Sequence, residues 1–212
     1  MDKIFHSTFE FFSHALPGAI MAVCLFLFKT TIVSPVDFIT ELNAFDTPHG
    51  VAILVAGYII GFAVYPIGRN IYKGWGKKRW PENAVLTGNI NLFISKKYSL
   101  IRQHSPENFR YIEMWNMYCA MSHNLALAML VLGMVAVVKA VVVFSIISLI
   151  WLAIAALGFG LFVAFIHRAV VFSTWAADDL NATLRILKLY TDDDVIADKN
   201  ERAAEKPENA RK

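Results

Sequence analysis

The fold is decided by one long apolar stretch, residues 119–166, which reads CAMSHNLALAMLVLGMVAVVKAVVVFSIISLIWLAIAALGFGLFVAFI and contains Lys139 as its single charge. As one helix this stretch would be about 70 Å long at ~1.5 Å per residue, more than twice the hydrocarbon thickness of a bilayer. The chain is therefore expected to fold back near Lys139. This gives two antiparallel spans, 117–138 and 141–166, joined by a very short turn.

Two further apolar runs precede this stretch, at 15–33, where Lys29 is the only charge, and at 51–68, which has none. Backbone groups in lipid must be hydrogen-bonded within their own segment, and runs this long do not suit barrel strands. The composition agrees, with 57% hydrophobic and 17% charged residues among 212. The predicted fold class is an all-α polytopic membrane protein with four transmembrane helices, the third and fourth of which extend into the cytoplasm. The first run is interpreted as a span and not as a cleaved signal peptide, because no small-residue cleavage site ends it.

The charges are distributed asymmetrically between the two sides of the predicted membrane. All but Lys29 and Lys139 of the 20 Lys and Arg residues lie on one side, whereas the segment 34–50 has three acidic residues and no basic one. The positive-inside rule then places both termini in the cytoplasm.

The resulting segments follow from the spans and from local helix signals. Ser105-Pro106-Glu107 has the pattern of a helix start, and 91–103 is expected to form a short amphipathic helix with Lys97 on its polar face. In order, the predicted segments are a cytoplasmic or interfacial N-terminal segment (1–14), a first span (15–33), a periplasmic loop (34–50), a second span (51–68), a basic cytoplasmic loop with the start of the third helix (69–116), a third span (117–138), a fourth span (141–166), a cytoplasmic helical extension (167–190) and a disordered tail (191–212).

A basic and aromatic segment follows the second span directly. Cations beside tryptophan rings suit an anionic headgroup layer, although such a patch also suits phosphates and stacked bases. Its position next to a span favours lipid, so nucleic acid is not the expected partner. The residues predicted to contact lipid headgroups are Arg69, Lys73, Trp75, Lys77, Lys78 and Arg79.

Polar residues recur at helical spacing in the third predicted helix: Glu113, Asn116, His123 and Asn124. Because unpaired polar groups are costly in hydrocarbon, this stripe should face other helices or water. Two interpretations stay open: an ion, proton or ligand path, and hydrogen bonding between helices.

Small residues mark where helices approach closely, and the predicted packing residues are Gly57, Gly61, Ala156, Gly160 and Ala164. Packing within one subunit explains them. A homo-oligomer is also expected, because four helices leave no space for a pore inside one bundle.

No catalytic pattern is present in the sequence. It has no phosphate-binding glycine loop, no HExxH, no CxxC and no nucleophile elbow, and its six histidines lack metal-ligand spacing. We therefore expect no enzyme activity, no catalytic residues, no cofactor and no metal.

Three short stretches carry a resemblance to a known group of proteins. Leu16-Pro17-Gly18, Gly57-Tyr58-Ile59-Ile60-Gly61 and Arg110-Tyr111-Ile112-Glu113-Met114 resemble small four-span proteins of bacterial anti-phage defence, across about residues 10–175. The membrane subunit of the Kiwa system and the transmembrane effectors of cyclic-oligonucleotide signalling are the most similar in layout. The resemblance implies an inner-membrane oligomer that engages a soluble partner and senses or disturbs the membrane during infection. It implies no functional residue.

The leading hypothesis is thus an oligomeric inner-membrane subunit whose cytoplasmic surface docks a soluble protein. The alternatives are a small channel or transporter that uses the polar stripe, and a passive membrane anchor.

Overall fold

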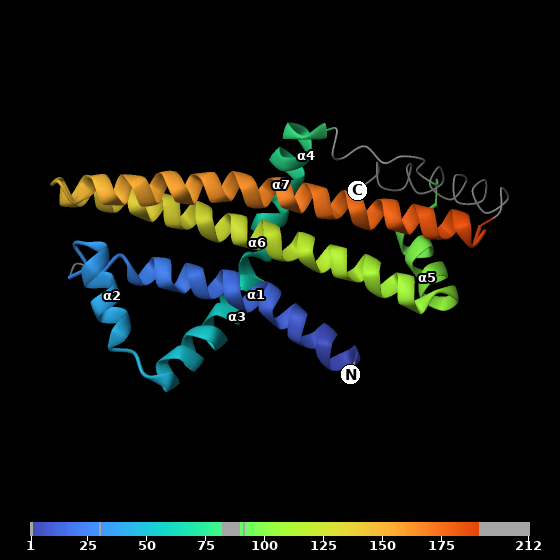
Figure 1. The fold of residues 1–212 in the computed structure, drawn as a ribbon, viewed down its shortest axis with the longest axis horizontal. Coiled ribbons are helices and arrows are strands. Elements are labelled where there is room, and N and C mark those ends of the chain that lie inside the picture. Colours follow the sequence, from blue (N-terminus) through green and yellow to red (C-terminus); the bar gives the residue numbers. More distant parts are fainter. Residues whose placement is uncertain (1, 30, 82–89, 91, 191–212) are drawn as a thin grey trace, which may run out of the picture. The chain divides into compact units, whose positions relative to one another are not determined.

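The computed structural model describes residues 2–29, 31–81, 90 and 92–190, with residues 2–10 described by their backbone only. These residues form helices and no strand, as the predicted all-α class requires. The helices are α1 (Asp2–Phe26), α2 (Pro35–Asn43), α3 (Thr47–Ile71), the π-helix η1 (Tyr72–Gly76), α4 (Lys77–Arg79), α5 (Ile94–His104), α6 (Pro106–Val143) and α7 (Ser148–Ile186), shown in Figure 1. The tail 191–212, for which disorder was predicted, lies outside the described residues.

Three helices are long and apolar enough to cross a membrane: the continuous helical segment Thr47–Arg79, α6 and α7. The chain is therefore an all-helical protein with the helices of a membrane protein. The apolar part of α1, Phe11–Phe26, is shorter than these three. The helix α1 also includes residues 2–14 and ends at Phe26, not at Val33 as the first span was drawn. The next residues are rich in β-branched side chains, which favour extended backbone, and Ser34 is already the extended N-cap of α2.

The fold-back between α6 and α7 comes later than predicted. The helix α6 continues to Val143, and the chain reverses through Phe144, whose φ is +33°. Lys139 therefore lies inside α6 and not at the turn. Its position was mispredicted because its ammonium group is hydrogen-bonded inside the protein and does not need to reach the surface.

The predicted loop 34–50 contains a helix that the sequence analysis did not anticipate. Ser34 Oγ accepts a hydrogen bond from the backbone N–H of Asp37, and the Asp37 carboxylate accepts one of 2.7 Å from the N–H of Ser34. This reciprocal pair is a capping box, and Pro35 occupies the first helical turn of α2. The expected start of α6 at Pro106 is confirmed, with Asn108 Nδ2 donating to Ser105 Oγ over 2.9 Å.

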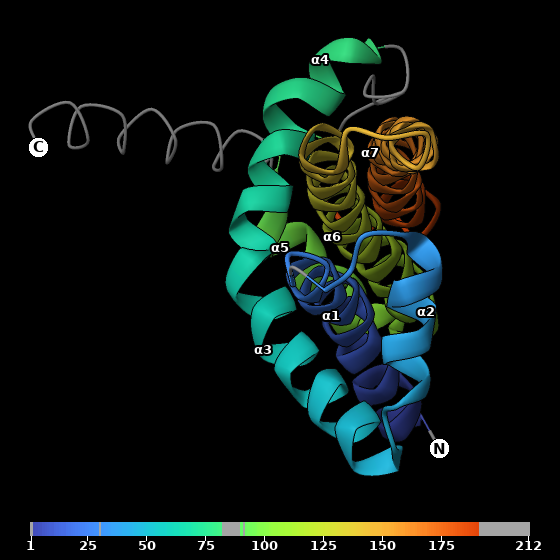
Figure 2. The same cartoon turned by 90° about the vertical axis from the view of Figure 1, so that its left-hand side faces the viewer.

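The chain divides into two compact units, and α6 and α7 contribute to both. The first unit consists of Met1–Pro81 and Met117–Val171, and the second of Glu82–Asn116 and Phe172–Lys212. In the first unit, α6 and α7 run side by side in opposite directions (Figure 1), and α1 lies next to α3 (Figure 2). A hydrophobic core joins α1, α6 and α7, and its buried residues are Cys24, Leu27, Ile32, Val135, Ala136, Ala140, Trp151 and Ala155.

The second unit has a hydrophobic core of its own. It is made by α5, the first turns of α6 and the last turns of α7, and its buried residues are Ile90, Leu92, Ile101, Phe109, Ile112, Ala176, Leu180 and Leu184. Lys97 is also buried here, contrary to its predicted place on the polar face of α5, and its Nζ donates to Asn181 Oδ1 over 2.9 Å. The long methylene stem allows a lysine to lie on the apolar face when its ammonium group finds a partner.

Candidate functional site

A buried polar cluster lies in the first unit where α1, α3 and α6 meet. His123 and Asn124 of α6 are only 2% and 0% exposed. Asn124 Nδ2 donates to the carbonyl oxygen of Ser13 over 3.4 Å and lies 3.3 Å from Nδ1 of His14. The ring of Tyr65 is 5.0 Å from that of His123 between centroids. The cluster therefore joins polar groups of three helices within the apolar bundle.

Two atoms of this cluster are buried without a hydrogen-bond partner among the described residues: His123 Nδ1 and Asn124 Oδ1. Such atoms are rare in folded proteins and call for an explanation. A Cβ on Gly68 would lie 2.9 Å from the His123 carbonyl oxygen and 3.1 Å from Nδ1. Glycine at position 68 therefore lets the α3 backbone approach the carbonyl oxygen and Nδ1 of His123. The two unpaired atoms, His123 Nδ1 and Asn124 Oδ1, are suited to bind a water molecule, and the imidazole nitrogen can also exchange a proton.

The predicted polar stripe of α6 is divided between the two units. His123 and Asn124 belong to the first unit, whereas Glu113 and Asn116 belong to the second. Asn116 is exposed, and its Nδ2 donates to the Tyr98 hydroxyl over 2.6 Å. Helical spacing alone placed these four residues on one face, but their partners differ. The structure brings together only His123 and Asn124.

The predicted headgroup residues are all exposed and lie in one stretch, from the last turn of α3 through η1 and α4. The stretch is helical but not a regular α-helix, since η1 has π geometry. Trp75 stacks on Phe162 of α7, with ring centroids 5.5 Å apart and planes 16° apart. This contact holds the basic stretch against α7.

The predicted small residues have two different environments. A Cβ on Gly57 would lie 2.5 Å from the backbone N of Ala19, and one on Gly61 would lie 2.0 Å from the carbonyl oxygen of His14. Both glycines therefore lie at the contact of α3 with α1. The predicted residues on α7, Ala156, Gly160 and Ala164, are exposed in contrast. In the same stretch of α7, between residues 151 and 164, the buried small residues are Ala155 and Gly158, and a Gly158 Cβ would lie 3.0 Å from the backbone N of Gly133 in α6.

A second polar network, which the sequence analysis missed, surrounds the linker between α1 and α2. Lys139 Nζ donates to the carbonyl oxygens of Ile32, over 2.7 Å, and Lys29, over 3.0 Å. The indole Nε1 of Trp151 donates to the carbonyl oxygen of Val33 over 2.9 Å. Donors from α6 and α7 thus hold three carbonyl groups of one short linker. The only available sequence signal was the isolated lysine itself.

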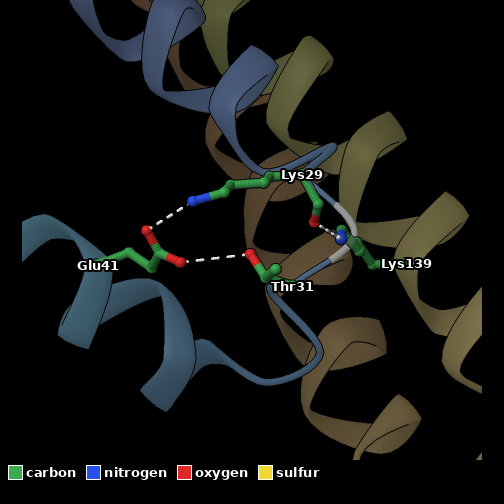
Figure 3. A network of polar contacts seen from close by, with 4 residues as sticks. All are labelled: Lys29, Thr31, Glu41 and Lys139. Atoms are coloured by element: carbon green, nitrogen blue, oxygen red, sulfur yellow. Dashed lines mark hydrogen bonds and ion pairs between the residues drawn. The ribbon is translucent and has the colours of Figure 1, made fainter.

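The same linker also makes side-chain contacts with α2. Lys29 Nζ forms an ion pair of 2.8 Å with Glu41, and Thr31 Oγ1 donates to the other oxygen of that carboxylate over 3.2 Å (Figure 3). The backbone of Lys29 is thus bound to α6, and its side chain to α2. The network connects α1, α2, α6 and α7.

The described part of the chain contains no group of three His, Cys, Asp or Glu residues that could hold a metal ion. Comparison with protein-family models, curated proteins and solved structures found no match to the chain.

Proposed function

We propose that the chain is an oligomeric integral protein of the bacterial inner membrane that docks a soluble cytoplasmic protein and has no enzyme activity. The observation that carries this proposal is the length of α6 and α7, which have 38 and 39 residues. At 1.5 Å per residue each is nearly 60 Å long, about twice the hydrocarbon thickness of a bilayer. Each must therefore project well beyond the membrane.

The projecting ends have their own packing. The second unit has a separate hydrophobic core, so its helices are stabilised without lipid. Trp115 Nε1 donates to Asp179 Oδ2 over 2.8 Å, and its ring contacts Trp175 at 5.0 Å between centroids. These contacts join α6 to α7 within this unit and favour a folded platform that is suited to binding another protein.

The platform presents apolar side chains to its surroundings. Tyr111 is 60% exposed and Ile186 is 77% exposed. Tyrosine is a typical anchor of protein interfaces, and the cores of interfaces are apolar. On this proposal the partner is a soluble protein with a complementary apolar pocket, and its binding shifts the arrangement of α6 and α7.

The orientation follows from the charges. The segment around α2 has Asp37, Glu41 and Asp46 and no Lys or Arg, which supports a periplasmic location. On this proposal α1 is a fourth span, both termini are cytoplasmic and the second unit is cytoplasmic. The resemblance noted above supports a role in anti-phage defence, in which the protein senses or perturbs the membrane.

Partner capture tests the docking surface. The tagged chain is expressed with the genes that surround its own, extracted in detergent and purified. The double variant Tyr111→Ala/Ile186→Ala should lose the captured partner, and Phe144→Ala should retain it. Phe144 is a suitable control because it is 91% exposed but lies at the turn between α6 and α7. Equal capture by both variants would contradict the proposed surface, and capture of nothing by the wild type would favour a passive anchor.

The second candidate function is a channel or transporter, favoured by the unpaired buried atoms of His123 and Asn124. Ion or proton flux into vesicles that contain the purified protein tests it. This candidate predicts that His123→Ala and Asn124→Ala lose flux while the oligomer persists. Flux unchanged in both variants removes it.

A further inference from the structure

The end of the α3–η1–α4 segment holds a concentration of positive charge. Arg69, Lys73, Lys77, Lys78 and Arg79 are exposed, and residues 47–81 contain no Asp or Glu. None of these five cations forms an ion pair with a carboxylate among the residues that the structure describes. Cations so close in sequence repel one another, so a bound anion would stabilise this segment.

Aromatic contacts hold this segment against α7. Besides the stacking of Trp75 on Phe162, the ring of Trp80 packs edge-on against His167 with centroids 5.1 Å apart. Trp75 and Trp80 also contact each other at 5.6 Å. Two rings of the basic segment thus contact two rings of α7. The cations are carried by a packed structure and not by a free loop.

The π-helix brings the backbone itself close to α7. Gly76 is buried, and a Cβ there would lie 2.6 Å from Cγ2 of Ile166. Any side chain would push η1 away from α7. Isolated π turns are frequent at functional sites, where they redirect the side chains that follow. Here the residues that follow Gly76 are Lys77, Lys78 and Arg79.

Two of the cations lie over aromatic rings. Lys77 Nζ is 5.4 Å from the ring centroid of Tyr72, and Arg79 Cζ is 5.8 Å from that of Trp80. A ring face attracts a cation but does not neutralise its charge. These contacts position the two groups and leave them able to bind an anion.

The apolar surface next to these cations favours a particular kind of anion. Only 11% of the residues in the most apolar part of the helical segment Thr47–Arg79 are buried. Phe62 and Ile67, at 65% and 53% exposed, lie between the middle of the helix and its basic end. An anion that also carries acyl chains would contact both surfaces, whereas a nucleic acid would leave the apolar one uncovered.

We infer that the segment from Arg69 to Trp80 is a binding site for the headgroup of an anionic glycerophospholipid such as phosphatidylglycerol. The cations bind the headgroup phosphate, the tryptophan rings lie at the membrane interface, and the acyl chains run along the outer face of α3. This inference rests on the proposed function, in which α3 crosses the membrane. The bound lipid stabilises the contact of this segment with α7.

Lipid titration of the full-length protein in detergent micelles tests the site. Native mass spectrometry measures binding of phosphatidylglycerol and of phosphatidylcholine. The test variant is Lys73→Gln/Lys78→Gln, because neither lysine takes part in the aromatic contacts described above. The control, Arg102→Gln/Lys188→Gln, removes the same charge from exposed residues of the second unit. We expect the test variant to lose roughly tenfold or more in affinity for phosphatidylglycerol, as expected for two cations at an anionic surface. The control should bind as the wild type does.

Three outcomes would overturn the inference. The first is equal binding of both lipids by the wild type, and the second is an equal loss in the test and control variants. The third is binding of a single-stranded oligonucleotide that depends on Lys73 and Lys78 in the absence of a lipid preference, which would make the segment a nucleic-acid surface.

Extraction of membranes with alkaline carbonate separates this inference from the proposed function. A protein that stays in the membrane without preferring phosphatidylglycerol contradicts only the lipid site, whereas a protein that is extracted contradicts the membrane topology.

Discussion

Lys139 donates a hydrogen bond of 2.7 Å from its Nζ to the carbonyl oxygen of Ile32, across 107 positions of the chain. A charged group is costly inside an apolar bundle unless it is hydrogen-bonded. The ammonium group of Lys139 also donates to a second carbonyl group, that of Lys29. These two carbonyl groups lie in the linker that follows α1, and that of Lys29 also accepts a hydrogen bond of 3.2 Å from the backbone N–H of Ile32. Lys139 therefore fixes the linker between α1 and α2 to α6.

Replacement of this lysine should destabilise the first unit. Lys139→Met keeps the volume of the stem but leaves the Ile32 carbonyl group without its donor, whereas the Lys29 carbonyl group keeps the hydrogen bond from the Ile32 N–H. The expected loss is about 1–3 kcal/mol in the free energy of unfolding. Unfolding by dodecyl sulfate in mixed micelles measures it, and Lys188→Met, at an exposed lysine of the second unit, is the control. Unfolding of the Lys139→Met protein at the wild-type denaturant concentration would show that the bond makes no net contribution.

The ion pair between Lys29 and Glu41 should appear in the titration of Glu41. Hydrogen bonding from Lys29 is the largest influence on this carboxyl group, and it holds the pKa of Glu41 below its ordinary value. A pKa that is lower in the folded state stabilises the fold above the unfolded-state pKa of about 4.3, and this contribution is lost as the pH falls through the folded-state pKa. In Lys29→Gln the pKa of Glu41 should rise toward its ordinary value.

Carbon-detected NMR of labelled side-chain carboxyl groups measures this shift. Asp37 provides an internal control, because its pKa is lowered mainly by the hydrogen bond from the backbone of Ser34. The Lys29→Gln substitution should therefore leave the Asp37 titration unchanged. If the pKa of Glu41 does not move, the ion pair does not persist in solution.

The apolar runs made the three long helices predictable, because an apolar segment that crosses a membrane must hydrogen-bond its backbone within itself. The ends of α1 and α6 lie inside apolar runs and were not predictable in this way. The start of α6 was predictable from Ser105 and Pro106. The same pattern, Ser34-Pro35 followed by Asp37, begins α2, but the segment was predicted to be a loop because it lies between two apolar runs. In this case the signal was present in the sequence.

Other features depend on partners that are distant in sequence. A single lysine in an apolar run suits either a turn or a buried hydrogen bond, and the acceptors of Lys139 lie far away in the sequence. The rotation of α7 about its own axis also depends on distant partners. Ala155 and Ala156 are equally small, but only Ala155 is buried, because Trp151 of the same face packs into the core. The neighbouring helices determine that choice.

The contact between α1 and α3 should tolerate no side chain at Gly61. A Cβ at this position would lie 2.0 Å from the backbone carbonyl oxygen of His14, so the two helices would have to separate. Gly61→Ala should therefore lower the free energy of unfolding by about 1–3 kcal/mol, the usual cost of overpacking. The matched control is Gly160→Ala in α7, where a Cβ would meet nothing within 4 Å. Better helix propensity makes this control neutral or stabilising by up to about 1 kcal/mol. Equal effects of the two substitutions in dodecyl sulfate unfolding would contradict the close contact.

The last turn of α7 should be stabilised by a glycine at position 188. The backbone N–H of Leu189 donates to the carbonyl oxygen of Leu184, and that of Lys188 donates to Arg185, which together form a Schellman motif. Lys188 has a φ of +50°, in the left-handed region that costs a side chain about 1 kcal/mol. Lys188→Gly should recover most of this energy, and Arg185→Gly, inside the helix, should cost about 1 kcal/mol. Hydrogen exchange of the amides in the last turns of α7 measures both changes, with slower exchange expected for the first variant and faster exchange for the second. Faster exchange in Lys188→Gly would mean that the lysine side chain stabilises this helix end by more than its backbone conformation costs.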